Sequence, residues 1–371
     1  MNNHIPKIGV IGSRGITSTY GGVEASVREI YTRLAKRGYD IYIFSENSYS
    51  TPELESYDGI TVIRLPCIKG KHSETLSRSL LATLSGIKSN LDIIHFHAQG
   101  SGILSPLIRL VGNRSILTVH GLDWKRDKWS LWAKMCIQLA EKTAVRFINN
   151  TVVVSHVLQR YFRDTYDYDT TYIPNGVTLK PLSITSRGIT SLSLIKDEYI
   201  LFASRLVPEK GCHDLIDVFN SINTTYRLVI AGESRYDTPY ISMLKKKADP
   251  CKIIFTGHVT GAILDELYTN AYLFVLPSYI EGLSLALLEA LSFGTCPLVS
   301  DIPENLEVIE DHGYSFHLGN NTSFRSTLED LLTSTYKVKQ KAVTARPYIA
   351  NKYNWDSVAD NVVELSGAIE G

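Results

Sequence analysis

Two basic and two acidic side chains in the second half of the chain have the types and spacing to bind a diphosphate together with the hydroxyls of a sugar. Arg205 and Lys210 share the short segment SRLVPEKG, which follows an apolar run and precedes a helix-length segment. Two fixed cations in such a position can hold a diphosphate and stabilise its charge as it departs. Glu281 and Glu289 lie eight positions apart in IEGLSLALLEALSF. A carboxylate among leucines is costly to bury unless hydroxyls or amides satisfy it, and sugar hydroxyls meet that need.

Each of these groups also has an ordinary structural explanation. Arg205 and Lys210 can be solvated surface cations, and Glu289 can be a salt-bridged helix residue. For the two cations, binding is favoured by their position at a strand end that opens into a helix. For the glutamates, it is favoured because a helix begins beside Glu281, and the backbone N–H groups at a helix start form an anion cradle. We expect that cradle at Gly282, Leu283 and Ser284.

A glycine-rich turn near the start of the chain is a second candidate anion site. The segment GSRGITSTYGGVE begins at Gly12 and joins the apolar run IGVI to a helix. It does not fit the dinucleotide fingerprint G-x-G-x-x-G with an acidic residue about 20 positions later, because the acidic Glu46 is too distant. Gly21 and Gly22 still allow backbone amides to approach an anion at the start of the helix. A merely permissive turn is the alternative.

Length and composition indicate two ordinary globular domains. The 371 residues exceed the roughly 250 to 300 at which a single core stops growing, and 44% are apolar against 20% charged. Lys plus Arg and Asp plus Glu number 38 each, so there is no global field to attract nucleic acid, and we expect no nucleic-acid partner. The segment MNNHIPK lacks the regions of a secretory signal, and no stretch approaches the roughly 18 apolar residues that span a bilayer. We expect a cytoplasmic location.

Short apolar runs alternate with helix-length segments in two series, a pattern typical of parallel sheets covered on both faces. The first series runs from KIGVIG through YDIYIFS, ITVIRL, LDIIHFHA and SILTVH to TVVVS, and the second from YILFASR through YRLVIAG, KIIFTGHV and AYLFVLPS to TCPLVSD. A segment rich in Pro, Gly, Ser and Thr, 171–198, separates them. We expect an α/β fold with two Rossmann-like, doubly wound domains at 1–175 and 176–345, and a C-terminal helix in 346–371 that packs back on the first domain.

Several polar side chains follow directly after these apolar runs. In open parallel sheets the ligand binds beyond the carboxyl ends of the strands. The residues found there are Arg14, His95, His97, His120, Arg205 and Glu281. With two such sheets facing each other, the cleft between the domains is the natural site.

Several short motifs together resemble one enzyme family. The segments EGLSLALLE, SRLVPEKG, FTGHV, IPNGV and HGLD are similar to those of the retaining glycosyltransferases of family four, which have the GT-B fold, and the resemblance covers essentially the whole chain. The opening GSRGITSTYGGVE is similar to a subgroup that includes bacterial rhamnosyltransferases of surface polysaccharide assembly. The resemblance implies transfer of a sugar, rhamnose being one candidate, from a nucleotide diphosphate sugar to a hydroxyl of a glycan or lipid-linked glycan. A nucleotide-sugar 2-epimerase of the same fold and a non-catalytic glycan-binding protein are the alternatives.

The resemblance also implies roles for individual residues. Arg205 and Lys210 hold the donor diphosphate, Glu289 the ribose hydroxyls, and Glu281 the hydroxyls of the transferred sugar. His120, at the end of SILTVH, faces that sugar near the reacting carbon. His120 and Glu281 are therefore the expected catalytic residues.

Backbone and loop positions supply the remaining donor contacts that the resemblance implies. The opening turn faces the phosphates and the acceptor, and the loop after FTG borders the base. These positions are Gly21, Gly22, Gly282, Leu283, Ser284, His258 and Val259. The chain departs from the family pattern at Ser284, where many members have Gly, and at Thr178, where Asp is frequent.

No metal or other cofactor is predicted. Asp167 and Asp169 flank Tyr168 in a D-x-D pattern, but the polar surroundings favour a solvated turn. His95 and His97 have a spacing that zinc can use, with no third ligand evident nearby, so histidines of a core or a cleft wall are favoured.

The segment 125–147 is a candidate membrane contact. It is basic and places Trp129, Trp132, Cys136 and Ala140 along one helical stripe. Such a helix can lie on an anionic bilayer and bring the chain to a lipid-linked acceptor at the inner face of the cell membrane. Ordinary packing against the sheet is the alternative.

Overall fold

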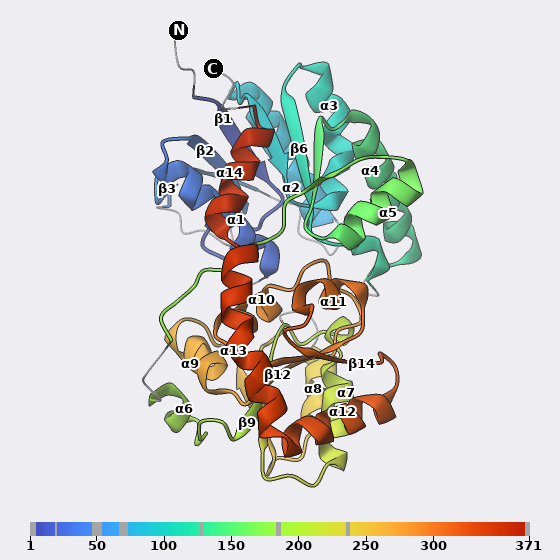
Figure 1. Cartoon of the computed structure of the whole chain (residues 1–371). Helices are drawn as coiled ribbons and strands as arrows, with labels where there is room; N and C mark the ends of the chain where they lie inside the picture. Colours follow the sequence, from blue (N-terminus) through green and yellow to red (C-terminus); the bar gives the residue numbers. More distant parts are fainter. Residues whose placement is uncertain are drawn as a thin grey trace. The chain divides into compact units, whose positions relative to one another are not determined.

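The structure of the chain is a computed structural model that describes residues 5–18, 21–46, 54–66, 73–126, 129–182, 187–234 and 238–367. The chain divides into two compact units, one made of 1–176 with 355–371 and the other of 177–354 (Figure 1). The second unit therefore extends to Asn354, beyond the boundary at 345 expected from the sequence. The segment that returns to the first unit begins at Trp355.

Within the described residues, the first unit holds an eight-stranded sheet in the order β3-β4-β2-β1-β5-β6-β7-β8. β3 pairs with β4 in antiparallel fashion, and the other neighbouring pairs are parallel. The chain builds outward from β1 on one side and restarts at β5 on the other, so the strand order reverses between these two strands. The strands are β1 (Lys7–Ile11), β2 (Asp40–Glu46), β3 (Ser56–Tyr57), β4 (Ile60–Leu65), β5 (Ile93–Phe96), β6 (Arg114–Val119), β7 (Asn150–Val153) and β8 (Thr171–Tyr172).

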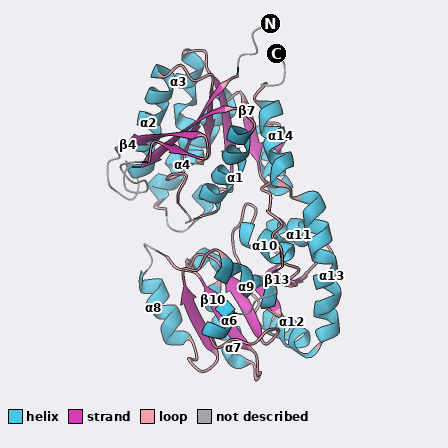
Figure 2. Cartoon of the chain, turned by 90° about the vertical axis from the view of Figure 1, so that its left-hand side faces the viewer, coloured by secondary structure: helices cyan, strands magenta, loops and turns pink. Residues whose placement is uncertain are grey.

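Helices cover both faces of this sheet. α1 lies on one face together with the returning α14, and α2, α3 and α4 lie on the other (Figure 2). α1 buries Val27, Ile30, Tyr31 and Leu34, which are spaced as one face of a helix. The bounds are α1 (Gly22–Lys36), α2 (Ser73–Lys88), η2 (Gln99–Leu104), α3 (Ser105–Leu110), η3 (Asp123–Lys125), α4 (Leu131–Phe147), α5 (His156–Tyr166) and α14 (Trp355–Leu365).

The second unit has, in the part of the chain that the structure describes, a six-stranded parallel sheet in the order β11-β10-β9-β12-β13-β14. The strand order reverses between β9 and β12. The strands are β9 (Tyr199–Ala203), β10 (Arg227–Ala231), β11 (Ile253–Gly257), β12 (Leu273–Leu276), β13 (Pro297–Ser300) and β14 (Tyr314–Phe316). The helices are α6 (Arg187–Ser191), η4 (Pro208–Lys210), α7 (Cys212–Ser221), α8 (Thr238–Lys247), α9 (Ala262–Asn270), α10 (Leu285–Ser292), α11 (Pro303–Ile309), α12 (Asn321–Thr333) and α13 (Thr335–Lys352).

The expected fold class, α/β with two Rossmann-like doubly wound sheets, is confirmed. Every apolar run that predicted a strand forms one, because strands covered on both faces need continuous apolar sequence. β9 and β12 are buried along their whole length. The sequence did not predict β3, β8 and β14, which have two or three residues each and lie at the edges of the sheets. The arrangement of the two domains across a common cleft stays a prediction.

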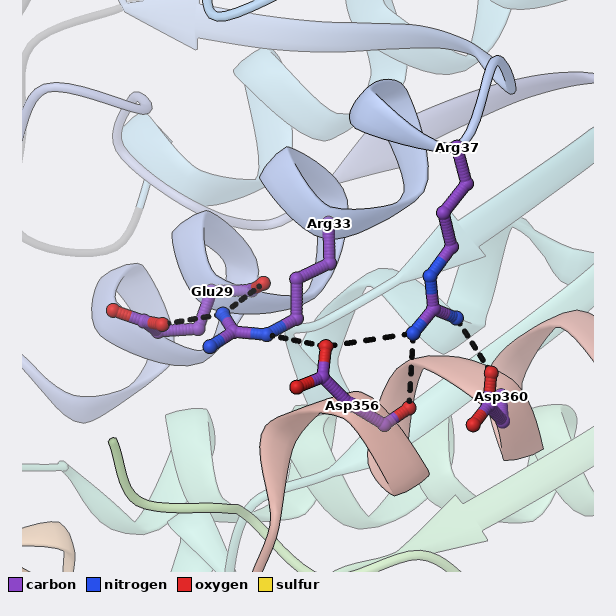
Figure 3. Close-up of polar contacts among 5 residues, drawn as sticks. All are labelled: Glu29, Arg33, Arg37, Asp356 and Asp360. Atoms are coloured by element: carbon purple, nitrogen blue, oxygen red, sulfur yellow. Dashed lines mark hydrogen bonds and ion pairs between the residues drawn. The ribbon is translucent and has the colours of Figure 1, made fainter. Parts of the chain in front are cut away.

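Charged side chains link α14 to α1 (Figure 3). Nη1 of Arg33 lies 2.6 Å from Oε2 of Glu29, and its Nε lies 3.2 Å from Oδ1 of Asp356. Arg37 contacts the same oxygen at 3.4 Å and Oδ1 of Asp360 at 2.5 Å. Asp356 lies in the first turn of α14, where the helix dipole favours an acidic group. Because these pairs are partly exposed, each adds at most about 1 kcal/mol.

We expect the apolar face of α14 to contribute more stability than this charged network. Val362 is buried, and Val362→Ala removes two methyl groups, so the free energy of unfolding should fall by about 2 kcal/mol. Arg37→Ala should lower it by less than about 1 kcal/mol, and added salt should shrink that loss. Urea unfolding of the two variants measures both effects. Equal losses of unfolding free energy in the two variants would contradict a larger contribution from the apolar face.

Candidate functional site

The loops that follow β9 and β12 bring a lysine and a glutamate into contact. Nζ of Lys210 lies 2.5 Å from Oε1 of Glu281. The side chain of Lys210 is 13% exposed and that of Glu281 is 6% exposed. β9 and β12 are neighbours at the point where the strand order of the second sheet reverses. Ligands of open parallel sheets bind beside that point, so the pair lies where a site is expected.

Backbone packing holds these two loops together. Gly211 has a φ of +68°, and a Cβ at this residue would lie 2.0 Å from the carbonyl oxygen of Pro277. The N–H of Tyr279 donates a hydrogen bond of 2.9 Å to the carbonyl oxygen of Glu209. The glycine of SRLVPEKG is therefore required both by its backbone angle and by the close approach of the other loop. This approach brings Lys210 to Glu281.

Other predicted donor residues lie along the same carboxyl edge of the second sheet. Arg205 follows β9 and is half-buried, and within the described residues its guanidinium has no ion-pair partner. His258 is exposed and Val259 is half-buried, and both follow the edge strand β11. The structure thus puts the predicted cations after β9 and the predicted base-side residues after β11, at the same edge of one sheet and with β10 between the two strands.

The helix α10 begins directly after the candidate anion cradle. Ser284 is its N-cap, and the hydroxyl oxygen accepts a hydrogen bond of 3.4 Å from the N–H of Leu287. Gly282 and Leu283 precede the cap and are buried. Serine is among the preferred N-cap residues. This capping role explains a serine at a position where the family pattern has glycine.

Glu289 has a hydroxyl partner within the protein. It lies half-buried on α10, and Tyr268 of α9 forms a side-chain hydrogen bond with it. Burial raises the pKa of Tyr268 well above its usual range, and the charge and hydrogen bond of Glu289 raise it further. Tyr268 therefore supplies part of the hydrogen bonding that a carboxylate among leucines requires. The binding of Glu289 to a ribose stays a prediction.

In the first unit, three histidines and a tyrosine form a buried hydrogen-bonded ladder at the carboxyl ends of β5 and β6. The hydroxyl of Tyr31 lies 2.7 Å from Nδ1 of His95 and 2.9 Å from Nε2 of His97. His95 continues through Nε2 to the hydroxyl of Thr118 at 2.7 Å, and His97 continues through Nδ1 to Nε2 of His120 at 3.1 Å. The predicted catalytic His120 is thus the end of a network, half-buried, with its ring stacked on His97.

Burial keeps these rings uncharged. It lowers the pKa of His95 to about 3 and that of His120 to about 4, and it lowers the pKa of His97 well below its usual range. The other histidines add to the effect at His95 and His97. Around His120, Asp123 raises the pKa and Arg126 lowers it, and both effects are smaller than that of burial. At neutral pH the ladder is made of neutral imidazoles.

A second buried network holds the loop that carries His120. Oε1 of Gln99 accepts a hydrogen bond of 3.1 Å from the backbone N–H of Asp123, and its amide nitrogen donates to Glu141. Glu141 is buried on α4 and also accepts from Tyr161 at 2.7 Å and Tyr166 at 2.5 Å. Burial raises the pKa of Glu141, while the tyrosines lower it.

Sequence reasoning missed Tyr31, Gln99 and Glu141. The strand period of two places His95 and His97 on one face of β5, and this pattern was visible. Nothing in the local sequence around the tyrosine, 64 residues before His95, indicates that its hydroxyl bridges the two rings.

The opening glycine turn has a carboxylate at the start of its helix. Gly21 is the N-cap residue of α1, and a Cβ on it would lie 2.5 Å from an oxygen of Glu24. Glu24 is buried, and its carboxylate lies 3.7 Å from Nη1 of Arg14. The acidic group occupies the end of the helix that favours negative charge. The carboxylate of Glu24 would therefore compete with an anion bound at Gly21 and Gly22. The binding of an anion by these two glycines stays a prediction.

The exposed face of α4 differs from the predicted stripe. The proposed alignment of Trp129, Trp132, Cys136 and Ala140 is wrong, because Trp129 precedes the helix and Ala140 is buried. The large apolar side chains that α4 exposes are instead Leu131, Trp132, Met135 and Leu139. They lie about one helical turn apart, and exposed Lys142 and Arg146 continue the same face.

Two further findings concern metal ions and membranes. Among the described residues, no group of three or more His, Cys, Asp or Glu side chains is placed to hold a metal ion. Asp169, of the D-x-D pattern, is exposed and pairs with Arg163 at 2.9 Å.

No helix in the described ranges is both long and apolar enough to cross a membrane.

Comparisons with known proteins match both units of the chain. Residues 20–180 match the family model Glycosyltransferase Family 4, and residues 191–346 match Glycosyl transferases group 1. Over 369 residues the chain is 24% identical to the alpha-monoglucosyldiacylglycerol synthase of Acholeplasma laidlawii, covering 90% of this chain and 88% of that protein. It is 29% identical to the putative teichuronic acid biosynthesis glycosyltransferase TuaC of Bacillus subtilis, over 68% of this chain and 65% of that protein. The structure of Anabaena HepE in complex with UDP-glucose superposes with a TM-score of 0.82 at 16% identity, over 99% of this chain and 100% of that one.

The fold and these matches make the chain a glycosyltransferase with the GT-B fold. It is a family-four-like glycosyltransferase, because the two family models together span most of both units. The retaining mechanism and the rhamnosyltransferase subgroup stay predictions.

We expect the histidine ladder to make the first unit sensitive to acid. In the unfolded chain a histidine has a pKa near 6.5, whereas burial lowers that of His95 to about 3 and that of His120 to about 4. The unfolded state therefore binds more protons than the folded state below pH 6.5. The contribution of these histidines to the free energy of unfolding should be complete above that pH, and the free energy of unfolding should fall as the pH drops toward 4. Each ring should add a slope of up to about 1.4 kcal/mol per pH unit.

Urea unfolding at a series of pH values measures this slope. The variant His95→Gln removes one titrating ring and should show a smaller slope than the wild type. A wild-type stability that stays flat on acidification to about pH 5, well below the ordinary histidine pKa, would contradict the neutral ladder.

Proposed function

We propose that this chain transfers a sugar from a nucleotide diphosphate sugar to a hydroxyl of a glycan or lipid-linked glycan and keeps the anomeric configuration. The observation that carries the proposal is the contact between Lys210 and Glu281 at the reversal point of the second sheet, with Arg205 on the same edge. A buried ion pair adds little net stability, because desolvation of the two charges offsets their attraction. A ligand that needs both a cation and a carboxylate explains the pair better than stability does.

The parts of the donor correspond to separate groups along that edge. Arg205 and Lys210 hold the diphosphate, and Glu281 bonds the hydroxyls of the transferred sugar. HepE, a protein of similar fold, has been solved with UDP-glucose, which supports a nucleotide sugar as the donor. We assign the remaining donor contacts to Glu289 at the ribose, to His258 and Val259 at the base, and to Gly282, Leu283, Ser284, Gly21 and Gly22 at the phosphates.

The chemistry requires stabilisation of a departing diphosphate. Arg205 and Lys210 supply positive charge where the negative charge develops, as a metal ion does in other enzymes, so we propose that no metal cofactor is needed. The acceptor hydroxyl attacks from the face that the diphosphate leaves, and the departing phosphate takes its proton. Glu281 orients the transferred sugar. His120 supports the transition state by hydrogen bonding as a neutral ring, since burial lowers its pKa to about 4.

The Lys210→Ala variant tests the proposed role of the lysine. Turnover should fall by about 10² to 10³, the scale on which one preorganised electrostatic contact is lost. The matched control is Lys247→Ala, which removes an exposed lysine that pairs with Asp217 on the same unit and should leave turnover unchanged. The assay measures sugar transfer in the presence of EDTA. Near-full activity of the lysine variant would refute its assignment, and a requirement for added Mg²⁺ would refute the metal-free proposal.

Product analysis separates transfer from the two alternatives. With a nucleotide sugar and a hydroxyl acceptor, a transferase forms a glycoside and releases nucleoside diphosphate in equal amounts. A 2-epimerase consumes the nucleotide sugar without any acceptor, and a glycan-binding protein consumes none. Turnover that depends on the acceptor therefore supports the proposal.

We also propose that the exposed face of α4 contacts an anionic membrane and brings the chain to a lipid-linked acceptor. Trp132 is 73% exposed and Leu131 is 82% exposed, and neither position is needed for the core. Lys142 and Arg146 add cations that attract acidic headgroups. One relative is named as a monoglucosyldiacylglycerol synthase, which supports a lipid-linked acceptor, and another is named for teichuronic acid biosynthesis, which supports surface polysaccharide synthesis. Rhamnose is one candidate for the transferred sugar.

Co-sedimentation with vesicles tests the membrane contact. The chain should bind vesicles that contain phosphatidylglycerol at low salt and should bind phosphatidylcholine vesicles weakly. The variant Trp132→Ser should reduce binding on the order of 10-fold, because it removes a large apolar side chain from the contact. Val343→Ser, at an exposed apolar position of the second unit, is the control and should not change binding. Failure of the wild type to bind anionic vesicles at low salt would remove this part of the proposal.

A further inference from the structure

The hydroxyl of Tyr31 lies between two ring nitrogens and has one proton. Its oxygen is 2.7 Å from Nδ1 of His95 and 2.9 Å from Nε2 of His97. A neutral imidazole carries one N–H and one bare nitrogen. Because the hydroxyl can donate to only one ring, the other ring must donate to the hydroxyl. The tautomers of His95 and His97 therefore depend on each other.

In the first arrangement, Tyr31 donates to Nε2 of His97. The proton of His97 then lies on Nδ1 and is donated to Nε2 of His120, so the proton of His120 lies on its own Nδ1. On the other side, Nδ1–H of His95 donates to Tyr31, and its bare Nε2 accepts from the hydroxyl of Thr118. All three rings carry their proton on Nδ1.

In the second arrangement, Tyr31 donates to Nδ1 of His95 and every other bond of the ladder reverses. His95 donates through Nε2 to Thr118, His97 donates through Nε2 to Tyr31, and His120 donates through Nε2 to His97. All three rings now carry their proton on Nε2. Both arrangements hold one proton on each ring and on each hydroxyl, so they have the same charge.

We propose that Tyr31 is a positioning residue that forces His95, His97 and His120 into one shared tautomer and thereby ties the donor or acceptor state of Nδ1 of His120 to the other two rings. Within the described residues, Nδ1 of His120 has no hydrogen-bond partner, so this atom is available to a ligand. In the first arrangement it offers an N–H, and in the second a lone pair. Sugar hydroxyls can use either.

The ladder therefore matches His120 to the hydroxyl that it meets without creating a charge. A ligand that donates to Nδ1 selects the second arrangement, and a ligand that accepts from it selects the first. This use of the ladder rests on the proposed sugar transfer, whereas the coupling of the tautomers follows from the contacts alone. The two can therefore be tested separately.

Thr118→Val tests the coupling from the far end of the ladder. Thr118 hydrogen-bonds to His95, and within the described residues no hydrogen bond joins it to either of the other rings. Valine leaves Nε2 of His95 without a partner, and a bare nitrogen tolerates this better than a buried N–H does, since orphaned buried N–H groups are rare. The first arrangement should become dominant, so the protons of all three rings should move to Nδ1.

Heteronuclear NMR of the full chain with isotope-labelled histidine reads the tautomers, because protonated and bare ring nitrogens have well-separated frequencies. The wild type should show one common tautomer ratio for the three rings, and Thr118→Val should shift all three together toward Nδ1–H. Thr151→Val, at a buried threonine of the adjacent strand β7, is the matched control and should shift none. A Thr118→Val spectrum in which His95 changes and His120 does not would overturn the proposal.

Tyr31→Phe should uncouple the two ends of the ladder. In that background Thr118→Val should still change His95 but should no longer change His120, and persistence of the change at His120 would also overturn the proposal. If Tyr31→Phe does not fold, the single variant Thr118→Val decides the question by itself. These spectra need no substrate, so they stand even if the proposed activity fails.

Kinetics then connects the ladder to catalysis. Tyr31→Phe should lower kcat by about 10-fold, the scale of one lost hydrogen bond, and should leave the KM of the donor nearly unchanged, because the proposed diphosphate contacts lie in the second unit. An unchanged kcat, with the tautomers uncoupled, would confine Tyr31 to a structural role and overturn its positioning role.

Discussion

The contact between Lys210 and Glu281 is the interaction on which the rest of the proposed donor site depends. It exists because Gly211 allows the loop after β9 to lie against Pro277 at the end of β12. Without that approach, the cation proposed for the phosphates and the carboxylate proposed for the sugar would not be in contact. A parallel sheet delivers both loops to the same edge, so the fold and the chemistry have a common origin.

The two sheets use their carboxyl edges in different ways. The second unit places charged groups there, with Arg205 beside the paired Lys210 and Glu281. The first unit places neutral rings there, linked by hydrogen bonds from His95 through the hydroxyl of Tyr31 to His97 and from His97 to His120. Charged groups suit a diphosphate, and neutral groups suit hydroxyls, because a neutral ring can donate or accept at no cost in charge.

The sequence predicted the features that local pattern controls. Strands covered on both faces have continuous apolar runs, and the polar residues after them lie at the sheet edge, so both were predictable. Contacts between side chains far apart in the sequence were not. Tyr31 reaches His97 across 66 positions. Tyr268 supplies part of the hydrogen bonding of Glu289, for which the sequence suggested a ligand or a salt bridge. Gly211 was predictable only in part. The sequence shows the glycine, but it does not show the carbonyl oxygen of Pro277 whose close approach requires a glycine there.

A crystal structure of the chain with a nucleotide diphosphate sugar bound tests the central claim most directly. The account predicts diphosphate oxygens at hydrogen-bond distance, about 3 Å, from both Arg205 and Lys210. It also predicts that hydroxyls of the transferred sugar bond to Glu281. A donor whose diphosphate contacts neither cation, with the Lys210–Glu281 pair facing no ligand, would contradict it.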